Sequence, residues 1–97
     1  MKLDDILKIL KDNLNEINNY GVIKLGVFGS FVKNTFSHDS DIDIVVQFKK
    51  GSKTFDNFMD LKFYLEKILN KKVDLVILEA IKPDLKDEIL KDVEYAA

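Results

Sequence analysis

The chain has 97 residues, 46% hydrophobic and 33% charged, with a net charge of −2. This balance is typical of a globular protein and predicts one domain over residues 1–97, and it argues against a nucleic-acid-binding module, which would carry a basic patch or stripe. The chain lacks cysteine, and lysine is its only basic residue type apart from His38. A metal must therefore be held by oxygen ligands or His38, and no arginine is present to bind phosphate through two parallel hydrogen bonds.

The sequence has no apolar stretch that approaches the roughly 20 residues of a membrane-spanning helix. Its first five residues are partly acidic and do not lead into an uninterrupted apolar segment, so they do not resemble a signal peptide. We therefore expect no membrane segment and a cytoplasmic location.

The first elements follow from hydrophobic spacing. Apolar residues recur at helical intervals from Leu3 to Ile17, which predicts one amphipathic helix ending near Tyr20 with Gly21 just beyond it. Val22–Phe28 is a short apolar run rich in β-branched and aromatic residues, which predicts a buried strand. A short helical turn over residues 31–34 and a polar loop over residues 35–40 follow.

The second half alternates strands and helices. Residues 41–48 begin with alternating polar and apolar residues, which predicts a second strand, and residues 73–78 predict a third. Between them Thr54 is suited to cap a helix over residues 55–70, and Pro83 is suited to the first turn of a last helix. The predicted apolar face of the longer helix comprises Phe55, Phe58, Met59, Leu61, Leu65, Ile68 and Leu69; that of the last helix comprises Leu85, Ile89, Leu90 and Val93.

Asp41 and Asp43 are two residues apart in a predicted strand, so their side chains should share one face, about 7 Å apart at Cα. Such carboxylates repel each other unless a cation lies between them, and Mg²⁺ fits that need. Asp74 interrupts the apolar third strand, where a buried carboxylate would require a partner or a metal. The alternatives are a solvated acidic face for the pair, and for Asp74 exposure to solvent or pairing with Lys71 or Lys72.

Gly29 and Ser30 follow the first strand and precede a helical turn. Glycine lets a phosphate approach the backbone closely, and the start of a helix offers unpaired N–H donors to an anion. The alternative is a simple strand exit with Ser30 as the helix N-cap. Together with the three acids, however, the turn predicts a site that holds a metal–triphosphate between backbone donors and carboxylates.

The spacing of these residues resembles the signature of the DNA polymerase β-like nucleotidyltransferases: Gly29-Ser30 is followed, after ten residues, by Asp41-Ile42-Asp43. The short length and the segment 72–76 around Asp74 resemble the minimal nucleotidyltransferases, which are often antitoxin partners of HEPN-domain toxins. This resemblance implies an α/β (α+β) fold with a small mixed sheet of three or more strands flanked by helices. It also implies ATP as the donor, Mg²⁺ or Mn²⁺ as the cofactor, and a site in which Asp41, Asp43 and Asp74 bind metal while Gly29 and Ser30 hold the triphosphate.

The sequence departs from the family pattern after Ser30. Many relatives carry Ala-Arg-Gly after the aromatic residue, whereas this chain has Val32-Lys33-Asn34. Lys33 keeps the positive charge for phosphate binding but loses the bidentate geometry of arginine. Asn34 tolerates a left-handed backbone less easily than glycine does.

The leading hypothesis is transfer of AMP from ATP to a hydroxyl, with Asp74 assisting the attacking oxygen. The resemblance suggests a tyrosine of a partner HEPN toxin as acceptor, in a toxin–antitoxin pair that works by AMP modification. Two other interpretations remain open: a non-catalytic antitoxin that neutralises its partner by forming a complex, and nucleotidyl transfer to a small molecule. Association of several identical chains also remains open.

Overall fold

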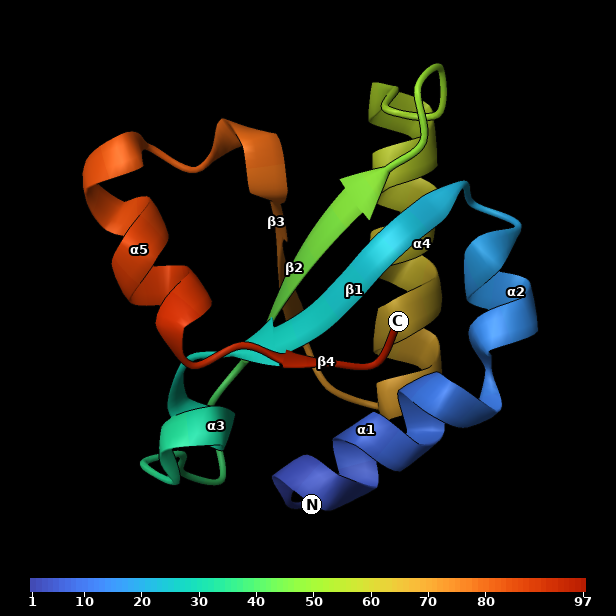
Figure 1. Ribbon diagram of the computed structural model, residues 1–97. Coiled ribbons are helices and arrows are strands. Elements are labelled where there is room, and N and C mark those ends of the chain that lie inside the picture. Colours follow the sequence, from blue (N-terminus) through green and yellow to red (C-terminus); the bar gives the residue numbers. More distant parts are fainter.

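The computed structural model describes all 97 residues as helices around one β-sheet (Figure 1). The strands are β1 (Val22–Phe28), β2 (Ile42–Phe48), β3 (Val73–Ile77) and β4 (Glu94–Tyr95). The helices are α1 (Leu3–Asp12), α2 (Leu14–Asn18), α3 (Ser30–Lys33), α4 (Phe55–Leu69) and α5 (Pro83–Lys91), and a 3-10 turn, η1 (Leu78–Ala80), follows β3. None of the helices combines the length and the apolar character that a membrane span requires.

The sheet is mixed, with the strand order β3-β2-β1-β4. β1 is antiparallel to β2 and β4, whereas β2 and β3 are parallel and are joined by α4. This arrangement confirms the expected small mixed sheet. Because β2 and β3 are parallel neighbours, residues near the starts of both strands also lie side by side.

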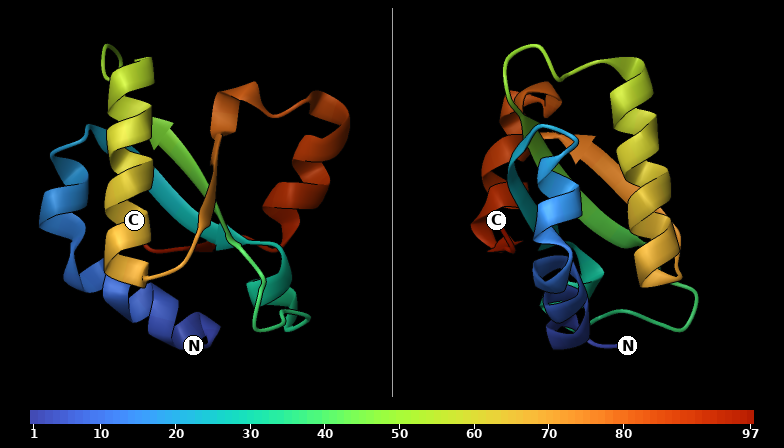
Figure 2. Two further views of the ribbon diagram at one scale, coloured as in Figure 1. Left: turned by 180° about the vertical axis from the view of Figure 1, so that it is seen from behind. Right: turned by 90° about the vertical axis from the view of Figure 1, so that its right-hand side faces the viewer.

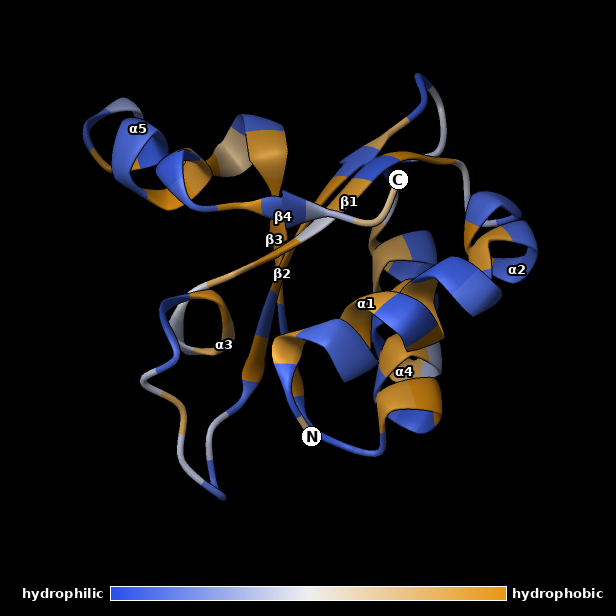
Figure 3. Ribbon diagram, turned by 60° about the horizontal axis from the view of Figure 1, so that its bottom comes forward, coloured by the Kyte–Doolittle hydropathy of each residue, from blue (hydrophilic) through white to orange (hydrophobic).

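Helices cover both faces of the sheet. α4 and α5 lie on opposite sides of it (Figure 2), and α1 and α2 pack with α4 into one hydrophobic cluster beneath the strands. Hydrophobic and hydrophilic residues alternate along α1 and α4 in Figure 3, as expected for helices with one buried face. The largest fully buried side chains are Ile6, Leu10, Ile17, Leu25, Ile42, Ile44, Leu61, Leu65, Leu69, Val27 and Val46.

The predicted first helix is divided into two, which corrects the sequence expectation. The break lies at Asn13, which has φ −114° and ψ 18°. Its side-chain amide donates a hydrogen bond to the carbonyl oxygen of Ile9 at 2.7 Å, and its side-chain oxygen accepts one from the Tyr64 hydroxyl at 3.2 Å. Asparagine side chains compete with the helix for backbone groups, and Tyr64 is 51 residues away, so helical periodicity alone could not reveal this break.

The start of α4 confirms one expectation and corrects another. The Thr54 hydroxyl accepts a hydrogen bond from the backbone N–H of Asn57 at 3.2 Å, which confirms Thr54 as the cap. Phe55, expected on the buried face, is 77% exposed. Phe55 is the first residue of α4 and borders an open hollow with Ile77 and Ala80, whereas Leu61 and Leu65, further along the helix, are fully buried.

β4 was not predicted, because two residues carry no detectable hydrophobic period. The strand pairs with β1 at Gly26 and Val27, and backbone hydrogen bonds between Leu25 and the last two residues extend the contact. Gly26 is required here, since a Cβ atom on it would collide with the side chain of Val93. The segment after α5 is therefore held closely against β1.

Candidate active site

Asp43 and Asp74 lie opposite each other on neighbouring parallel strands, β2 and β3. Paired residues of adjacent strands point to the same face, and the face that holds Asp43 and Asp74 is the one turned away from α4, since Ile42 and Ile44 are buried on the α4 side. Asp43 is half-buried and Asp74 exposed. The two carboxylates therefore share a face at one edge of the sheet, as the proposed site requires.

The pKa of the Asp43 carboxyl is raised above its usual value. Burial is the largest cause, and the negative charge of Asp74 and then that of Asp41 add to it. Asp41 precedes β2 and is exposed, yet its charge acts on Asp43. The three predicted acids thus form one electrostatic group centred on Asp43.

Gly29 lies directly against Asp43. The residue before it, Phe28, pairs with Asp43 across β1 and β2, and a Cβ atom on Gly29 would collide with the Asp43 carboxylate. Gly29 also has φ 75° and ψ −145°, a conformation that is essentially restricted to glycine. The backbone of the turn can therefore touch the carboxylate only because residue 29 has no side chain.

Ser30, Lys33 and Asn34 follow in the short helix α3 and its end. Gly29, and not Ser30, is the N-cap, and the Ser30 hydroxyl makes no hydrogen bond within the chain. The capping alternative for Ser30 is therefore wrong, and its half-buried hydroxyl is free to bind a ligand. Asn34 adopts the left-handed conformation, with φ 58° and ψ 35°, so it fills the position where many relatives have glycine.

The loop that carries Asp41 is held by Lys71, which precedes β3. The Lys71 ammonium donates hydrogen bonds to the carbonyl oxygens of His38 at 3.0 Å and Ser40 at 3.4 Å, and it lies 5.9 Å from the centroid of the Phe31 ring. The ion pairs of the chain join Lys8 to Asp12 and Lys53 to Glu79, so neither Lys71 nor Lys72 is paired with Asp74. The pairing alternative for Asp74 is therefore wrong.

The donor set suits a hard divalent cation but does not enclose one. No three His, Cys, Asp or Glu side chains in the chain are close enough to hold a metal ion between them. Mg²⁺ is usually bound through one or two carboxylates together with water and substrate phosphates, so a complete cage of protein ligands is not needed. The chemistry of these residues fits a metal whose coordination the substrate completes.

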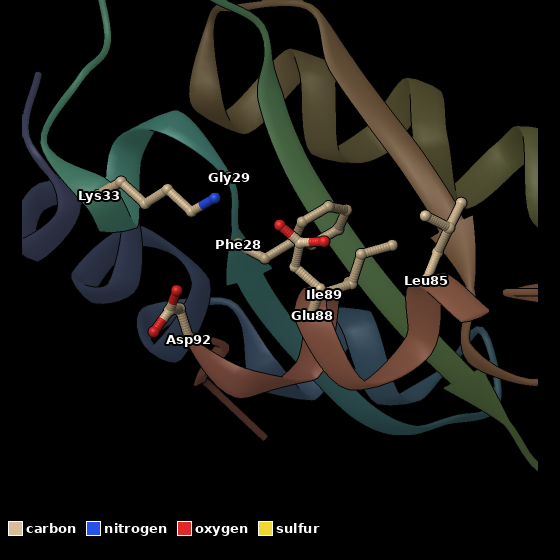
Figure 4. Close-up of a pocket in the computed structure, with 7 residues that line it drawn as sticks. All are labelled: Phe28, Gly29, Lys33, Leu85, Glu88, Ile89 and Asp92. Atoms are coloured by element: carbon tan, nitrogen blue, oxygen red, sulfur yellow. The ribbon is translucent and has the colours of Figure 1, made fainter. Parts of the chain in front are cut away.

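A hollow of about 280 Å³ adjoins Gly29 and Lys33 and is closed on its other side by α5 (Figure 4). Leu85 and Ile89 of α5 contribute apolar surface together with Phe28, and the α5 end contributes the carboxylates of Glu88 and Asp92. Glu88 and Asp92 were not among the predicted site residues. They carried no signal in the sequence, because only the return of the chain from β3 brings α5 beside Gly29.

Comparison with known proteins agrees with this geometry. The family described as "Nucleotidyltransferase domain" matches residues 3–96. A protein of Thermococcus cleftensis named protein adenylyltransferase MntA is 35% identical over 96 residues, covering 98% of this chain and 96% of its own length. A match at this identity over nearly the full length of both chains shows the family, because the similarity is not limited to one short segment.

Solved structures have the same fold. A minimal nucleotidyltransferase superposes with a TM-score of 0.81 at 28% identity, covering 97% of this chain and 95% of its own. A toxin–antitoxin structure with AMP-PNP gives 0.70 at 25% identity, covering 100% and 73%. A complex of tri-AMPylated Shewanella oneidensis HEPN toxin with MNT antitoxin gives 0.67 at 18% identity, covering 94% and 71%, and this last likeness concerns the fold alone. Sequence motif, site geometry and full-length matches together place the chain in the nucleotidyltransferase domain family, among the minimal nucleotidyltransferases, and it is an enzyme.

Proposed function

We propose that this enzyme transfers AMP from ATP to a tyrosine hydroxyl of a partner HEPN-domain toxin and acts as its antitoxin. The observation that carries the proposal is the pairing of Asp43 with Asp74 on one face of the sheet, with the Gly29 turn against Asp43. Support for the acceptor class comes from the relative named a protein adenylyltransferase and from the neighbour that contains an AMPylated HEPN toxin.

The nucleotide has an orientation that the charges favour. Triphosphate carries several negative charges, so it belongs near Lys33, the Ser30 hydroxyl and the backbone at Gly29. Glu88 and Asp92 would repel phosphate, but carboxylates accept hydrogen bonds from ribose hydroxyl and adenine amino groups. We therefore place the nucleoside in the hollow against α5 and the phosphates at its Gly29 end.

The reaction is an in-line displacement. The acceptor oxygen forms a bond to the α-phosphorus of ATP while the bond from that phosphorus to the bridging oxygen breaks, and pyrophosphate leaves with the bond's electron pair. Asp74 is exposed beside the reacting face and accepts the proton of the hydroxyl, directly or through water. The free Ser30 hydroxyl stabilises negative charge on the departing phosphates.

Asp41, Asp43 and Asp74 are the residues that would hold Mg²⁺ or Mn²⁺. When bound, the ion stabilises negative charge on the reacting phosphate and on the incoming and leaving oxygens. Burial, and then the negative charges of Asp74 and Asp41, raise the pKa of Asp43, and a divalent cation beside this carboxylate would offset both effects.

The decisive experiment uses ATP labelled at the α-phosphate, Mg²⁺ and the HEPN-domain protein of the same genome. We expect the label to appear on a tyrosine of the partner, identified by mass spectrometry. ATP labelled at the γ-phosphate should leave the partner unlabelled. Asp43→Asn should abolish the labelling, whereas Asp39→Asn, in the same loop region and outside the site, should not. Labelling from the γ-phosphate would contradict adenylyl transfer.

The same variants test the two rival functions. If the chain is a non-catalytic antitoxin, its Asp43→Asn variant should neutralise the partner as well as the parent chain does at equal dose. Transfer to a small molecule would give consumption of ATP in a metabolite extract without label on the protein partner. Either result would exclude AMP transfer to the toxin as the mechanism.

A further inference from the structure

β3 is an edge strand, so one side of its backbone has no neighbouring strand. The backbone N–H of Ile42 donates a hydrogen bond to the carbonyl oxygen of Lys72 at 3.0 Å, which shows which backbone groups of β3 face β2. Along a strand, the backbone groups of alternate residues point to the same neighbour. The N–H and C=O groups of Asp74 therefore face β2, whereas those of Val73 and Leu75 face the open edge.

One end of this edge is already closed by a side chain. The Val73 N–H donates a hydrogen bond to a carboxylate oxygen of Glu66 at 3.0 Å, in agreement with its outward direction. No side chain bonds to the backbone of Leu75, which is left with an unpaired donor and an unpaired acceptor. Unpaired groups along an open strand edge are a template for another extended chain.

Space is available along this edge. A hollow of about 320 Å³ is lined by the consecutive residues Val73, Asp74 and Leu75 of β3 and also by Phe58 and Met59 of α4. The side chains of consecutive strand residues point to opposite faces, so a hollow that touches all three follows the outer side of the strand. An added strand could therefore pair with the backbone of Leu75 and find room for side chains beside α4.

We propose that the open edge of β3 binds an extended segment of the acceptor protein as a fifth strand, with the acceptor residue opposite Asp74. This inference rests on the proposed function for the reaction that it serves. Residues directly opposite each other in a sheet point to the same face, with Cβ atoms about 4.5–5.5 Å apart. The residue opposite Asp74 therefore lies on the face that holds Asp43, the Gly29 turn and the hollow beside α5.

This position suits the direction of the reaction. The strand order places β1, which leads into Gly29, on one side of Asp43 and places β3 on the other side. In an in-line displacement the attacking oxygen and the leaving group lie on opposite sides of the phosphorus. With the leaving phosphates at the Gly29 end, a hydroxyl that arrives from the edge of β3 attacks from the required side.

The edge also determines which residues should flank the acceptor residue. The residues before and after it point to the opposite face of the sheet, where Phe58 and Met59 are half-buried in the hollow. Apolar side chains at these two positions would remove the exposed parts of Phe58 and Met59 from water. The segment that fits is therefore an extended one in which a hydroxyl residue stands between two apolar residues.

A second copy of this chain fits the edge poorly. Pairing of β3 with β3 of another copy would bring the acids of both sites, Asp41, Asp43 and Asp74, toward one another across the new strand pair. Like charges at neighbouring positions of a sheet are destabilising. The charge of the site thus favours a segment of another protein that places a neutral hydroxyl residue opposite Asp74.

Amide hydrogen exchange tests the backbone pairing directly. The isotopically labelled chain is mixed with the HEPN-domain protein of the same genome, Mg²⁺ and α,β-methylene ATP, in which the bond that must break is replaced, and exchange is followed by NMR. In the free chain the N–H of Leu75 should exchange fast, and that of Val76, which faces β2, slowly. The partner should slow exchange at Leu75 on the order of tenfold and leave Val76 unchanged. Unchanged exchange at Leu75 would overturn the inference.

A substitution in the hollow tests the flanking side chains. Met59→Lys places a charge where the apolar neighbours of the acceptor residue should pack, so it should raise the KM for the partner on the order of tenfold and leave the KM for ATP unchanged. Phe63→Lys is the matched control, because it introduces the same charge at an exposed apolar residue of the same helix outside the hollow. An unchanged KM for the partner in Met59→Lys, or an equal increase in Phe63→Lys, would count against the fifth strand.

Exchange and transfer together separate this inference from the proposed function. Transfer of AMP to the partner without slower exchange at Leu75 would leave the function standing and overturn the fifth strand. Slower exchange at Leu75 without transfer would support binding at the edge and overturn the proposed reaction. Absence of both would overturn both.

Discussion

Replacing Asp43 by asparagine should stabilise the metal-free protein, although Asp43 is central to the site. The folded state holds Asp43 half-buried and opposite Asp74, and burial and the charges of Asp74 and Asp41 raise its pKa. An ionised Asp43 is therefore less favourable in the folded chain than in the unfolded chain. Asparagine has nearly the same shape and removes the charge, so it should preserve the contact with Gly29.

Coulomb's law gives the part of the effect that comes from the charge of Asp74, and burial acts in the same direction. Neighbouring strands are about 4.8 Å apart, which puts the two carboxylates roughly 5–6 Å apart, and two unit charges at that distance repel by about 0.7 kcal/mol in water and about 3 kcal/mol at an effective dielectric constant of 20. Asp74 is exposed, so the value near the lower end applies, and we expect a gain of about 1 kcal/mol. For a chain of this size the gain corresponds to a Tm increase of about 4–8 °C.

Thermal unfolding followed by circular dichroism in EDTA, from pH 3 to pH 8, measures this gain. Below the unfolded pKa of about 3.9 Asp43 is protonated in both states, so Asp43→Asn and the parent should be equally stable. As pH rises through the raised pKa, the parent loses stability relative to the variant, and saturating Mg²⁺ should restore the parent alone. The reasoning is refuted if the variant unfolds at a lower temperature than the parent at pH 7 in EDTA, or if Asp39→Asn gives the same gain.

Substitutions at three further positions test the turn and the loop. Gly29→Ala should lower the free energy of unfolding by about 1–3 kcal/mol and abolish transfer, because a methyl group meets Asp43 and φ is positive; a denaturant titration with full stability retained would contradict the contact. Ser30→Ala should change stability by less than about 0.5 kcal/mol while raising the KM for ATP, and an unchanged KM would exclude its hydroxyl from phosphate binding. Lys71→Met should weaken Mn²⁺ binding, measured by electron paramagnetic resonance, because the loop before Asp41 loses the two hydrogen bonds from the Lys71 ammonium. Lys71→Arg should restore part of the affinity for Mn²⁺. Equal affinity in the parent and both variants would show that these hydrogen bonds do not position Asp41.

Much of the site could be predicted because it depends on local rules. Alternation along a strand identifies the face of Asp43, and a glycine after a strand identifies the turn at Gly29. The pairing of Asp43 with Asp74 depends on the register of β2 and β3, which the crossover through α4 fixes and which the sequence indicates only through the resemblance to known enzymes. The part that was missed, the carboxylates of Glu88 and Asp92, depends on where α5 lies in space.

The errors in the predicted fold also have physical causes. The helix break at Asn13 depends on a hydrogen bond to Tyr64, which is distant in sequence. Phe55 is exposed where the start of α4 meets Ile77 at the end of β3 and Ala80 in η1, and β4 depends on backbone pairing with Gly26 and Val27. In each case the deciding contact joins segments that no window of the sequence contains together.

The contact between Gly29 and Asp43 has a thermodynamic consequence for the order of assembly. Any ligand that moves the backbone of the turn also moves the carboxylate, and any ion that draws in the carboxylate alters the turn, so the affinities of nucleotide and cation must be linked by one reciprocal factor. Nucleotide affinity measured in EDTA and in Mg²⁺ should differ by the same ratio as cation affinity measured with and without nucleotide. We therefore expect the turn at Gly29 to couple the binding of nucleotide to the binding of a divalent cation.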